Sequence, residues 1–224
     1  MRGRRLAGLI ALAVITALGG LAAARRLGLT GAAPPDAPAH REPGQVAAQP
    51  DRPLTDIVRE RGWRRIPDLN VLVDKSDLTL AIRSGKQVLK SYPIALGNDD
   101  LDDKQRRNDR LTPEGEFYIC QRNLVPNSRA WDAVWIRLSY PNAEDADRGL
   151  AAGLIDEKQA RAIKRATSRK RRPPQDTALG SGIGIHAGGI EPRNWTQGCV
   201  ALQYADAVEL YHHLPMHTSV VIRK

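Results

Sequence analysis

The chain has 224 residues, of which 42% are hydrophobic and only 4% aromatic, a composition that is ordinary for a globular protein apart from its few aromatic residues. This length allows one sizeable domain with some additional segments and excludes a large multidomain assembly. The formal net charge of +9 at pH 7 favours attraction to an anionic polymer or a membrane surface.

The first 26 residues have the pattern of an export signal. Residues 1–5 are basic, residues 6–24 are apolar, and Arg25 and Arg26 follow them. As a helix, the apolar run would be about 28 Å long, close to the roughly 30 Å of a membrane's hydrocarbon core. Residues 1–26 are therefore predicted to be either a signal-anchor helix in the inner membrane or a cleaved signal peptide. Both alternatives predict a periplasmic or extracytoplasmic location, which excludes nucleic acid as a partner.

Two short segments separate this signal from the expected domain. Residues 27–53 are rich in Pro and Ala, a composition that cannot bury a core and predicts an extended linker. Residues 54–69 are predicted to be an N-terminal appendage. Its main element is predicted to be a short amphipathic helix within residues 54–65, with its end at Gly62, that packs on the domain.

The domain itself is predicted to begin at residue 70 with short strands. Residues 71–80 alternate in parts and contain β-branched side chains, so they predict a strand. A turn at residues 84–86 then reverses the chain into a second strand over residues 87–96. Residues 98–109 form a charged loop. Its acidic residues lack the glycine and the terminal glutamate of a calcium-binding loop, so no metal site is predicted there.

Two further strands are predicted over residues 116–122 and 134–138. Cys120 lies in the first of them and is interpreted as a buried strand residue. In an oxidising compartment it could pair with the second cysteine of the chain, Cys199, and the sequence leaves this open.

A helical insertion is predicted over residues 142–174. Asn142 can cap its first helix, and Asp156 with Gln159 resembles a capping box for its second, which ends before Pro173. The second helix and its end are rich in basic residues: Lys158, Arg161, Lys164, Arg165, Arg169, Lys170, Arg171 and Arg172. They are interpreted as a solvated helix face, with attraction of an anionic polymer as the alternative.

The stretch over residues 181–202 combines a histidine and a cysteine. His186 ends a strand-like run, and Cys199 lies in a polar turn directly after Gly198. Each residue alone is more often structural, since a lone Cys usually behaves as a small buried apolar residue. Together they form the minimum apparatus for covalent acyl transfer, in which a thiolate attacks while an imidazole takes and returns the proton. Backbone N–H groups around Gly198 and Cys199 could hold the oxyanion.

The C-terminal part is predicted to be a helix over residues 204–214 and a closing strand over residues 218–223. Near them, His212, His213 and His217 form a cluster without a ligand of another type, so no zinc site is predicted. Short strands with one helical insertion indicate a mainly β (α+β) domain.

The turn and its surroundings resemble a known family. Thr196-x-Gly198-Cys199-Val200, with His186 upstream, is similar to the core motif of the L,D-transpeptidases, the YkuD-like catalytic domain. Segments 71–86, 92–97, 112–118 and 138–142 also resemble this family, so the likeness covers residues 70–224.

The resemblance implies a β-sandwich-like catalytic core with the cysteine and histidine in a cleft. It implies catalytic roles for Cys199 and His186, and oxyanion or substrate contacts for Gly198, Gln197, Thr196, Gly188 and Trp195. It further implies peptidoglycan stem peptides as the partner, with no cofactor and no metal.

The sequence departs from the family pattern at three points. Ala187 follows the histidine where glycine is frequent, Ala201 stands where many members have arginine, and the spacing from His186 to Cys199 is short. A subgroup with a similar ending shares the last two features. Three functions therefore stay open: cross-linking by an L,D-transpeptidase, hydrolysis by an L,D-carboxypeptidase or cross-link-cleaving enzyme, and wall binding without catalysis.

Overall fold

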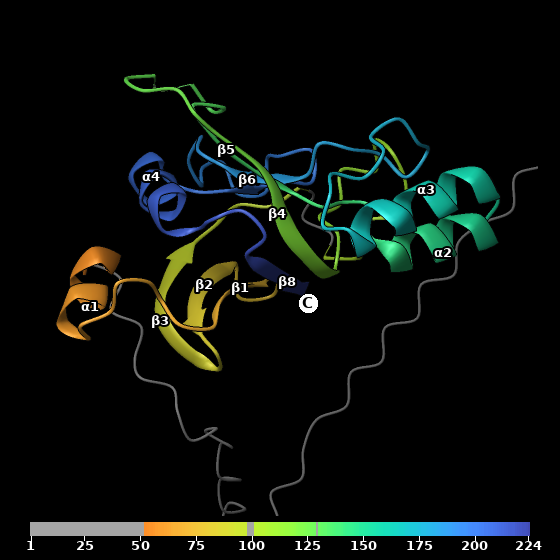
Figure 1. The fold of residues 1–224 in the computed structure, drawn as a ribbon. Coiled ribbons are helices and arrows are strands. Elements are labelled where there is room, and N and C mark those ends of the chain that lie inside the picture. Colours follow the sequence, from red (N-terminus) through yellow and green to blue (C-terminus); the bar gives the residue numbers. More distant parts are fainter. Residues whose placement is uncertain (1–51, 98–100, 129) are drawn as a thin grey trace, which may run out of the picture. The chain divides into compact units, whose positions relative to one another are not determined.

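The computed structural model describes residues 52–97, 101–128 and 130–224. The predicted signal or anchor over residues 1–26 lies outside these residues, as does nearly all of the predicted linker. Within them the elements follow the order α1 (Leu54–Glu60), β1 (Leu69–Asp74), β2 (Thr79–Ser84), β3 (Gln87–Pro93), β4 (Gly115–Leu124), β5 (Val134–Leu138), α2 (Ala143–Ala151), α3 (Glu157–Ser168), β6 (Gly184–His186), β7 (Val200–Ala201), α4 (Tyr204–His213) and β8 (Ser219–Arg223) (Figure 1). No helix among these residues has the length and apolar character needed to cross a membrane.

The eight strands form one sheet in the order β3-β2-β1-β8-β4-β5-β6-β7. The last strand of the chain, β8, lies in its middle, parallel to β1 and antiparallel to β4. β4 pairs with β8 through its first part and with β5 through its second part, so the two halves of the sheet meet in this strand. Ala95, just after β3, and Ala201 in β7 exchange two backbone hydrogen bonds of 3.0 and 2.8 Å. The sheet is therefore curled, because segments at its opposite edges meet.

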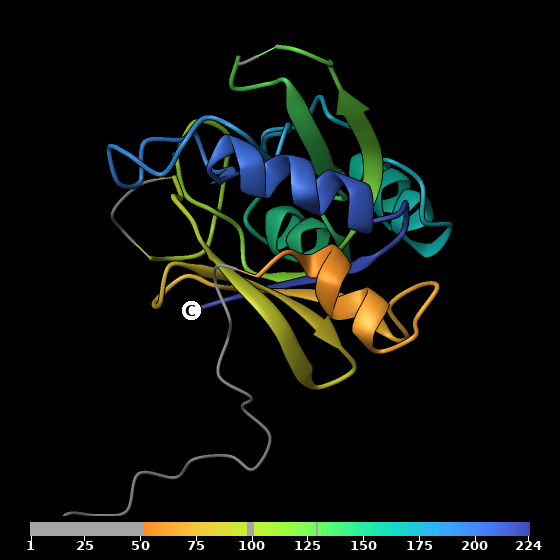
Figure 2. The same ribbon diagram turned by 90° about the vertical axis from the view of Figure 1, so that its left-hand side faces the viewer.

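The curled sheet encloses the main apolar core. Buried side chains from both halves belong to it, for example Val71 and Val220 from one half and Ile136 and Ile185 from the other. Helix α4 contributes Leu210 to this core and runs along the sheet (Figure 2). The prediction of a mainly β domain with helical elements is confirmed.

The strand predicted over residues 71–80 is wrong in its second half. The chain turns at residues 75–78, which separate β1 from β2, and these two strands pair as an antiparallel hairpin. In this turn Asp74 Oδ1 accepts from the Asp77 N–H at 3.1 Å. The buried ammonium of Lys75 donates to the carbonyls of Asp102 and Thr112 and pairs with Glu114 at 2.9 Å. Leu78 has a positive φ of 50°, as a tight turn requires.

Helix α1 is shorter than predicted, since it ends at Glu60 and Gly62 follows with a φ of 66°. It packs against the domain as expected, with Leu54 and Ile57 buried. Glu209 of α4 fixes it there: this carboxylate accepts hydrogen bonds from the Leu54 backbone N–H, from Lys90 Nζ at 2.7 Å and from the Tyr92 hydroxyl at 2.8 Å.

The helical insertion contains the two predicted helices. Both predicted caps are present, and each is a full capping box, Asn142 with Asp145 and Asp156 with Gln159. The two helices pack together around a separate small cluster that includes Ile163 and Leu179. In Figure 1 they lie side by side beyond β4.

Candidate active site

Two short parallel strands bring His186 and Cys199 to the same face of the sheet. In the register of β6 and β7, Ile185 is opposite Val200 and His186 is opposite Ala201. Continued by one residue, this register places Cys199 opposite Gly184. Side chains alternate along a strand, so His186 and Cys199 are diagonal neighbours on one face, a separation of about 7–8 Å between Cα atoms in a sheet.

The imidazole of His186 is buried, with 2% of the residue exposed. Its Nδ1 is hydrogen-bonded to the carbonyl oxygen of Ala187. A carbonyl can only accept, so Nδ1 carries the proton and Nε2 is left with the lone pair that a general base needs. Burial lowers the pKa of His186 below its ordinary value, and the hydrogen bond to Ala187 opposes this only partly. The imidazole is therefore neutral at pH 7.

Three tryptophans enclose this imidazole. Trp135 stacks on it with ring centroids 6.0 Å apart, while Trp131 and Trp195 contact it edge-on at 5.4 and 5.6 Å. The neighbouring glycines leave room for the indoles, because a Cβ on Gly184 would lie 3.1 Å from the ring of Trp135 and one on Gly188 would lie 2.9 Å from that of Trp195. The rings and the Ala187 carbonyl together fix the orientation of the imidazole.

The thiol of Cys199 is protonated at neutral pH. Its Sγ donates to the Gly182 carbonyl at 3.3 Å. Burial raises its pKa to about 11, even though a hydrogen bond from the Gly184 backbone and the positive charges of Arg137 and Lys104 lower it. The other cysteine, Cys120, is half-buried in β4, its Sγ contacts the Leu138 carbonyl at 3.4 Å, and neither cysteine is in a disulfide.

The turn before Cys199 is held by the buried hydroxyl of Thr196. This hydroxyl accepts from the Gly198 N–H at 3.1 Å and donates to the Cys199 carbonyl at 2.8 Å. Gly198 has a φ of 117°, and a Cβ there would lie 2.5 Å from the Leu111 carbonyl oxygen. The N–H of Gly198, named from the sequence as an oxyanion donor, therefore already has a partner, and the Cys199 N–H is the remaining candidate in this turn.

The other predicted substrate contacts lie around the same two residues. Trp195 and Gly188 lie at the imidazole, and the side chain of Gln197 is exposed beside the turn. The group that orients the imidazole is the backbone carbonyl of Ala187.

Sequence reasoning missed Trp131, Trp135 and Arg137. A signal for two of them exists in β5, where buried Val134, Ile136 and Leu138 alternate with half-buried Trp135 and Arg137. A tryptophan and an arginine on the less buried face of a core strand indicate a functional surface. Nothing in the sequence indicates that Trp131, in the preceding loop, reaches His186.

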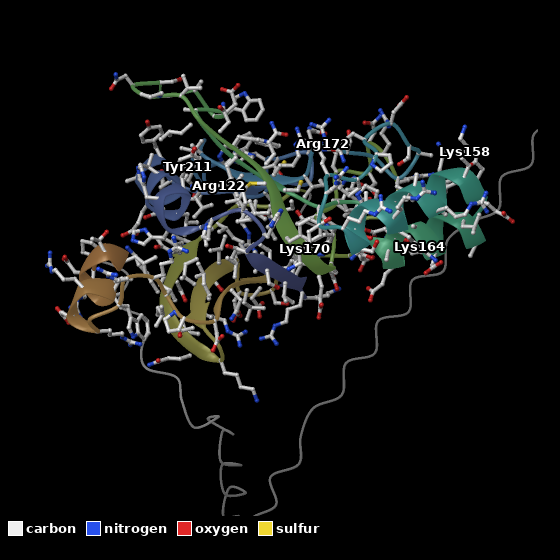
Figure 3. The ribbon with its side chains drawn as sticks, viewed as in Figure 1. Arg122, Lys158, Lys164, Lys170, Arg172 and Tyr211 are labelled. Atoms are coloured by element: carbon white, nitrogen blue, oxygen red, sulfur yellow. The ribbon has the colours of Figure 1, made fainter. Side chains whose placement is uncertain are left out.

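A cavity lies elsewhere on the domain. It has a volume of about 660 Å³ and is lined by residues of α1, β1, β4, the end of α4 and the loop after it, among them Arg122, His212, His213 and His217. Arg122 lies over the ring of Tyr211 beside it, and both are labelled in Figure 3. Within the described ranges, no group of three His, Cys, Asp or Glu side chains is placed to hold a metal ion.

Comparison with known proteins identifies one family. The model of the L,D-transpeptidase catalytic domain, YkuD, matches residues 69–222. Over 84 residues the chain is 38% identical to YafK of Escherichia coli (strain K12), named as an L,D-transpeptidase, and to its counterpart in Escherichia coli O157:H7. This match covers 36% of the chain and 33% of YafK, so it spans about a third of the curated relatives.

Two solved structures are similar to this chain at low identity. Bd1075 of Bdellovibrio bacteriovorus is 20% identical, with 71% of this chain and 48% of that chain covered and a TM-score of 0.45. The helical cell shape determining protein Pgp2 of Campylobacter jejuni is 18% identical, with 76% and 54% covered and a TM-score of 0.46. Since these TM-scores are below 0.5, the assignment rests on the family match alone.

Proposed function

Because the chain belongs to the YkuD family of L,D-transpeptidase catalytic domains, we propose that it is a cysteine acyltransferase that cross-links or remodels peptidoglycan stem peptides. L,D-transpeptidases act on peptidoglycan, so a cell-wall substrate follows from the family. The observation that carries the proposal is the placement of His186 and Cys199 on one face of neighbouring strands, with a neutral imidazole beside a protonated thiol.

The first half-reaction forms an acyl-enzyme. Cys199 Sγ attacks the carbonyl carbon that precedes a terminal D-amino acid, and its proton passes to His186 Nε2 as the S–C bond forms. Because burial raises the pKa of the thiol to about 11, the free thiolate is a minor form at pH 7. Proton transfer must therefore accompany attack. The C–N bond then breaks, and the imidazolium returns the proton to the leaving amine.

The second half-reaction resolves the thioester. An amine on a second stem attacks the acyl carbon and gives its proton to His186 Nε2, the C–S bond breaks, and the sulfur is reprotonated. The oxyanion of each tetrahedral intermediate needs a donor, and we assign the Cys199 N–H to it because the Gly198 N–H is engaged by Thr196.

The reaction is proposed to take place outside the cytoplasm. The basic start, the apolar run over residues 6–24 and the Pro- and Ala-rich segment after it support an exported domain on a tether. Whether the apolar run is retained as an inner-membrane anchor or removed as a signal peptide decides only how far the domain can travel from the membrane.

Hydrolysis is the second candidate. Water in place of the acceptor amine would give an L,D-carboxypeptidase or a cross-link-cleaving enzyme with the same Cys-His site. Ala201 keeps this candidate open, because the resemblance implies that many family members have arginine at that position. A wall-binding module without turnover is the third candidate.

Incubation of the full chain with purified muropeptides distinguishes the three. Transpeptidation gives dimers, hydrolysis gives trimmed monomers, and a binding module leaves the material unchanged. Cys199→Ala should abolish turnover and the acyl-enzyme adduct seen by intact mass, because it removes the nucleophile. The matched control Cys120→Ala, which changes the other cysteine, should retain turnover and the acyl-enzyme adduct. Turnover near the wild-type rate in Cys199→Ala would refute the mechanism.

A further inference from the structure

Arg137 is a positive charge that the mechanism above does not use, and it lies next to the nucleophile. On β5 it is opposite Gly184 of β6, while Cys199 flanks the same glycine from the other side. Gln175 links the two residues, because its Oε1 accepts from Arg137 Nη1 at 3.0 Å and from the Gly182 N–H at 3.1 Å. The carbonyl of that same Gly182 accepts from Cys199 Sγ.

The guanidinium of Arg137 is held in one orientation by neutral groups. Its Nε donates to Gln121 Oε1 at 3.0 Å, its Nη1 donates to Gln175, and its Cζ lies over the Trp135 ring, 5.3 Å from the ring centroid. Gln175 is itself fixed, since its amide nitrogen donates to the carbonyls of Tyr140 and Pro173. Arg137 is thus oriented in advance, without a counter-charge.

A second guanidinium shares this position. Arg172 Nη1 donates to the same Gln121 Oε1 at 3.3 Å. Burial and the nearby Arg172 charge lower the pKa of Arg137, as expected for two like charges held together. In the view of Figure 3, Arg172 lies apart from Lys158 and Lys164, which lie along α3.

No acidic side chain among the residues that the structure describes forms an ion pair with Arg137 or Arg172. The buried cations Lys75, Lys90 and Lys104 differ in this, because each pairs with a carboxylate at 2.9, 2.7 and 2.5 Å respectively. Two adjacent guanidiniums without a counter-charge repel each other, and a bound anion removes this repulsion. A planar carboxylate suits them best, because a guanidinium can bind both of its oxygens.

We propose that Arg137 and Arg172 form a subsite that binds the C-terminal carboxylate of the donor stem peptide. The inference rests on the proposed function for the identity of the peptide. In such a donor the terminal carboxylate is separated from the scissile carbonyl carbon only by the amide nitrogen and one carbon atom. A group that binds it must therefore lie close to Cys199, as Arg137 does. The subsite makes the enzyme select donors with a free terminal carboxylate.

The test measures binding without turnover. In a Cys199→Ala background, calorimetry compares a tetrapeptide donor with its C-terminal amide, which differs only in the terminal charge. We expect the amide to bind about 10- to 100-fold more weakly than the acid, the scale of a charge-assisted hydrogen bond. Adding Arg137→Gln should weaken binding of the acid by a similar factor and leave the amide nearly unchanged. Arg172→Gln should act in the same direction with a smaller loss.

The matched control is Arg171→Gln, which removes the same charge from an exposed neighbour of Arg172. It should bind the acid and the amide with the same affinities as the Cys199→Ala protein. Arg137→Lys keeps the positive charge but cannot donate to both carboxylate oxygens as a guanidinium does. Its affinity for the acid should therefore fall by less than that of Arg137→Gln. If Arg137→Gln does not fold, Arg172→Gln at the exposed position still tests the subsite, because its affinities for the acid and the amide can be compared in the same way. Equal affinities for acid and amide in the parent, or equal losses for both in Arg137→Gln, would overturn the subsite.

Failure of the subsite and failure of the proposed function can be distinguished. Preference for the acid that depends on Arg137, in a protein that turns over no muropeptide, would leave the subsite standing and remove the acyltransferase. Turnover that depends on Cys199 but is equal for the acid and the amide would support the acyltransferase and refute the subsite.

Discussion

The environment of His186 sets the chemistry at the scale of single residues. Three indoles and the Ala187 carbonyl surround the imidazole, and burial disfavours its charged form. The thiol of Cys199 is held in its neutral form for the same reason. The proposed mechanism therefore couples proton transfer to the attack of the sulfur and does not start from a thiolate–imidazolium pair.

This state predicts the pH dependence of the rate. Because burial lowers the pKa of His186 from 6.5, kcat/KM should decrease only when the pH falls below about 6.5, where the imidazole binds a proton and stops acting as a base. His186→Ala should reduce the rate about 10²- to 10⁴-fold and abolish this acidic limb. Initial rates from pH 4 to pH 9 measure both, and an unchanged profile in His186→Ala would show that another group is the base.

At the scale of elements, the start of α2 contains a buried carboxylate. Asp145 closes the capping box with Asn142 and pairs with Arg148 at 2.6 Å. Burial nevertheless raises its pKa from 3.8 to about 6, against hydrogen bonds from Asn142 and the charge of Arg148. The folded state thus binds this proton more tightly than the unfolded state does.

A stability measurement tests this assignment. The protonated form is favoured on folding, so the contribution is fully present below about pH 4 and is lost as the pH rises through about 6. The free energy of unfolding of the wild type, relative to Asp145→Asn, should therefore fall by roughly 2–3 kcal/mol between pH 4 and pH 7. Urea unfolding at four pH values measures it, and a difference independent of pH would contradict the raised pKa.

The basic end of α3 is the second element with a testable role. Arg169, Lys170 and Arg171 are exposed, whereas Arg161 and Lys164 on the helix pair with Glu157 and Asp147. Exposed charges attract a polyanion over about 10 Å at ordinary ionic strength. The three cations are therefore expected to attract the carboxylates of polymeric cell wall.

Changing Arg169, Lys170 and Arg171 together to Glu should raise KM for intact wall material, more at low salt than at high salt. Turnover of a small tetrapeptide should barely change, because long-range attraction matters less for a short ligand. The control changes three exposed cations elsewhere, Arg64, Arg65 and Lys86, to Glu. Equal kinetics on wall material at low salt in the α3 variant would favour the interpretation of a solvated helix face.

At the scale of the whole domain, Glu209 joins three elements. Its carboxylate binds Lys90 and Tyr92 of β3 and the first residue of α1. Glu209→Gln should lower the free energy of unfolding by about 3–5 kcal/mol, because Lys90, 5% exposed, would keep a buried charge without a partner. Chemical denaturation measures the loss, and Lys90→Met in the same chain should recover part of it. If the losses in free energy of unfolding simply add in the double variant of Glu209→Gln and Lys90→Met, Lys90 and Glu209 are not coupled.

The sequence by itself determined the local elements. Alternation in β5, the capping residues Asn142 and Asp156, and the turn at residues 84–86 act within a few residues, so they can be read along the chain. The motif likewise placed His186 at the end of a strand and Cys199 in a glycine turn, although their catalytic roles stay predictions. Their common face follows from the register of β6 and β7, which the sequence does not contain.

Only the tertiary structure decided which distant segments meet. β8 lies between β1 and β4, and the buried ammonium of Lys75 binds carbonyls of a loop that is remote in the sequence. The ring of Trp131 contacts the ring of His186, although the two residues are far apart along the chain. Arg137 and Arg172, which lie on different elements, converge on one amide oxygen. The physical reason is that hydrophobic periodicity fixes which face of an element is buried but not which partner covers it. That choice depends on packing the whole core at once.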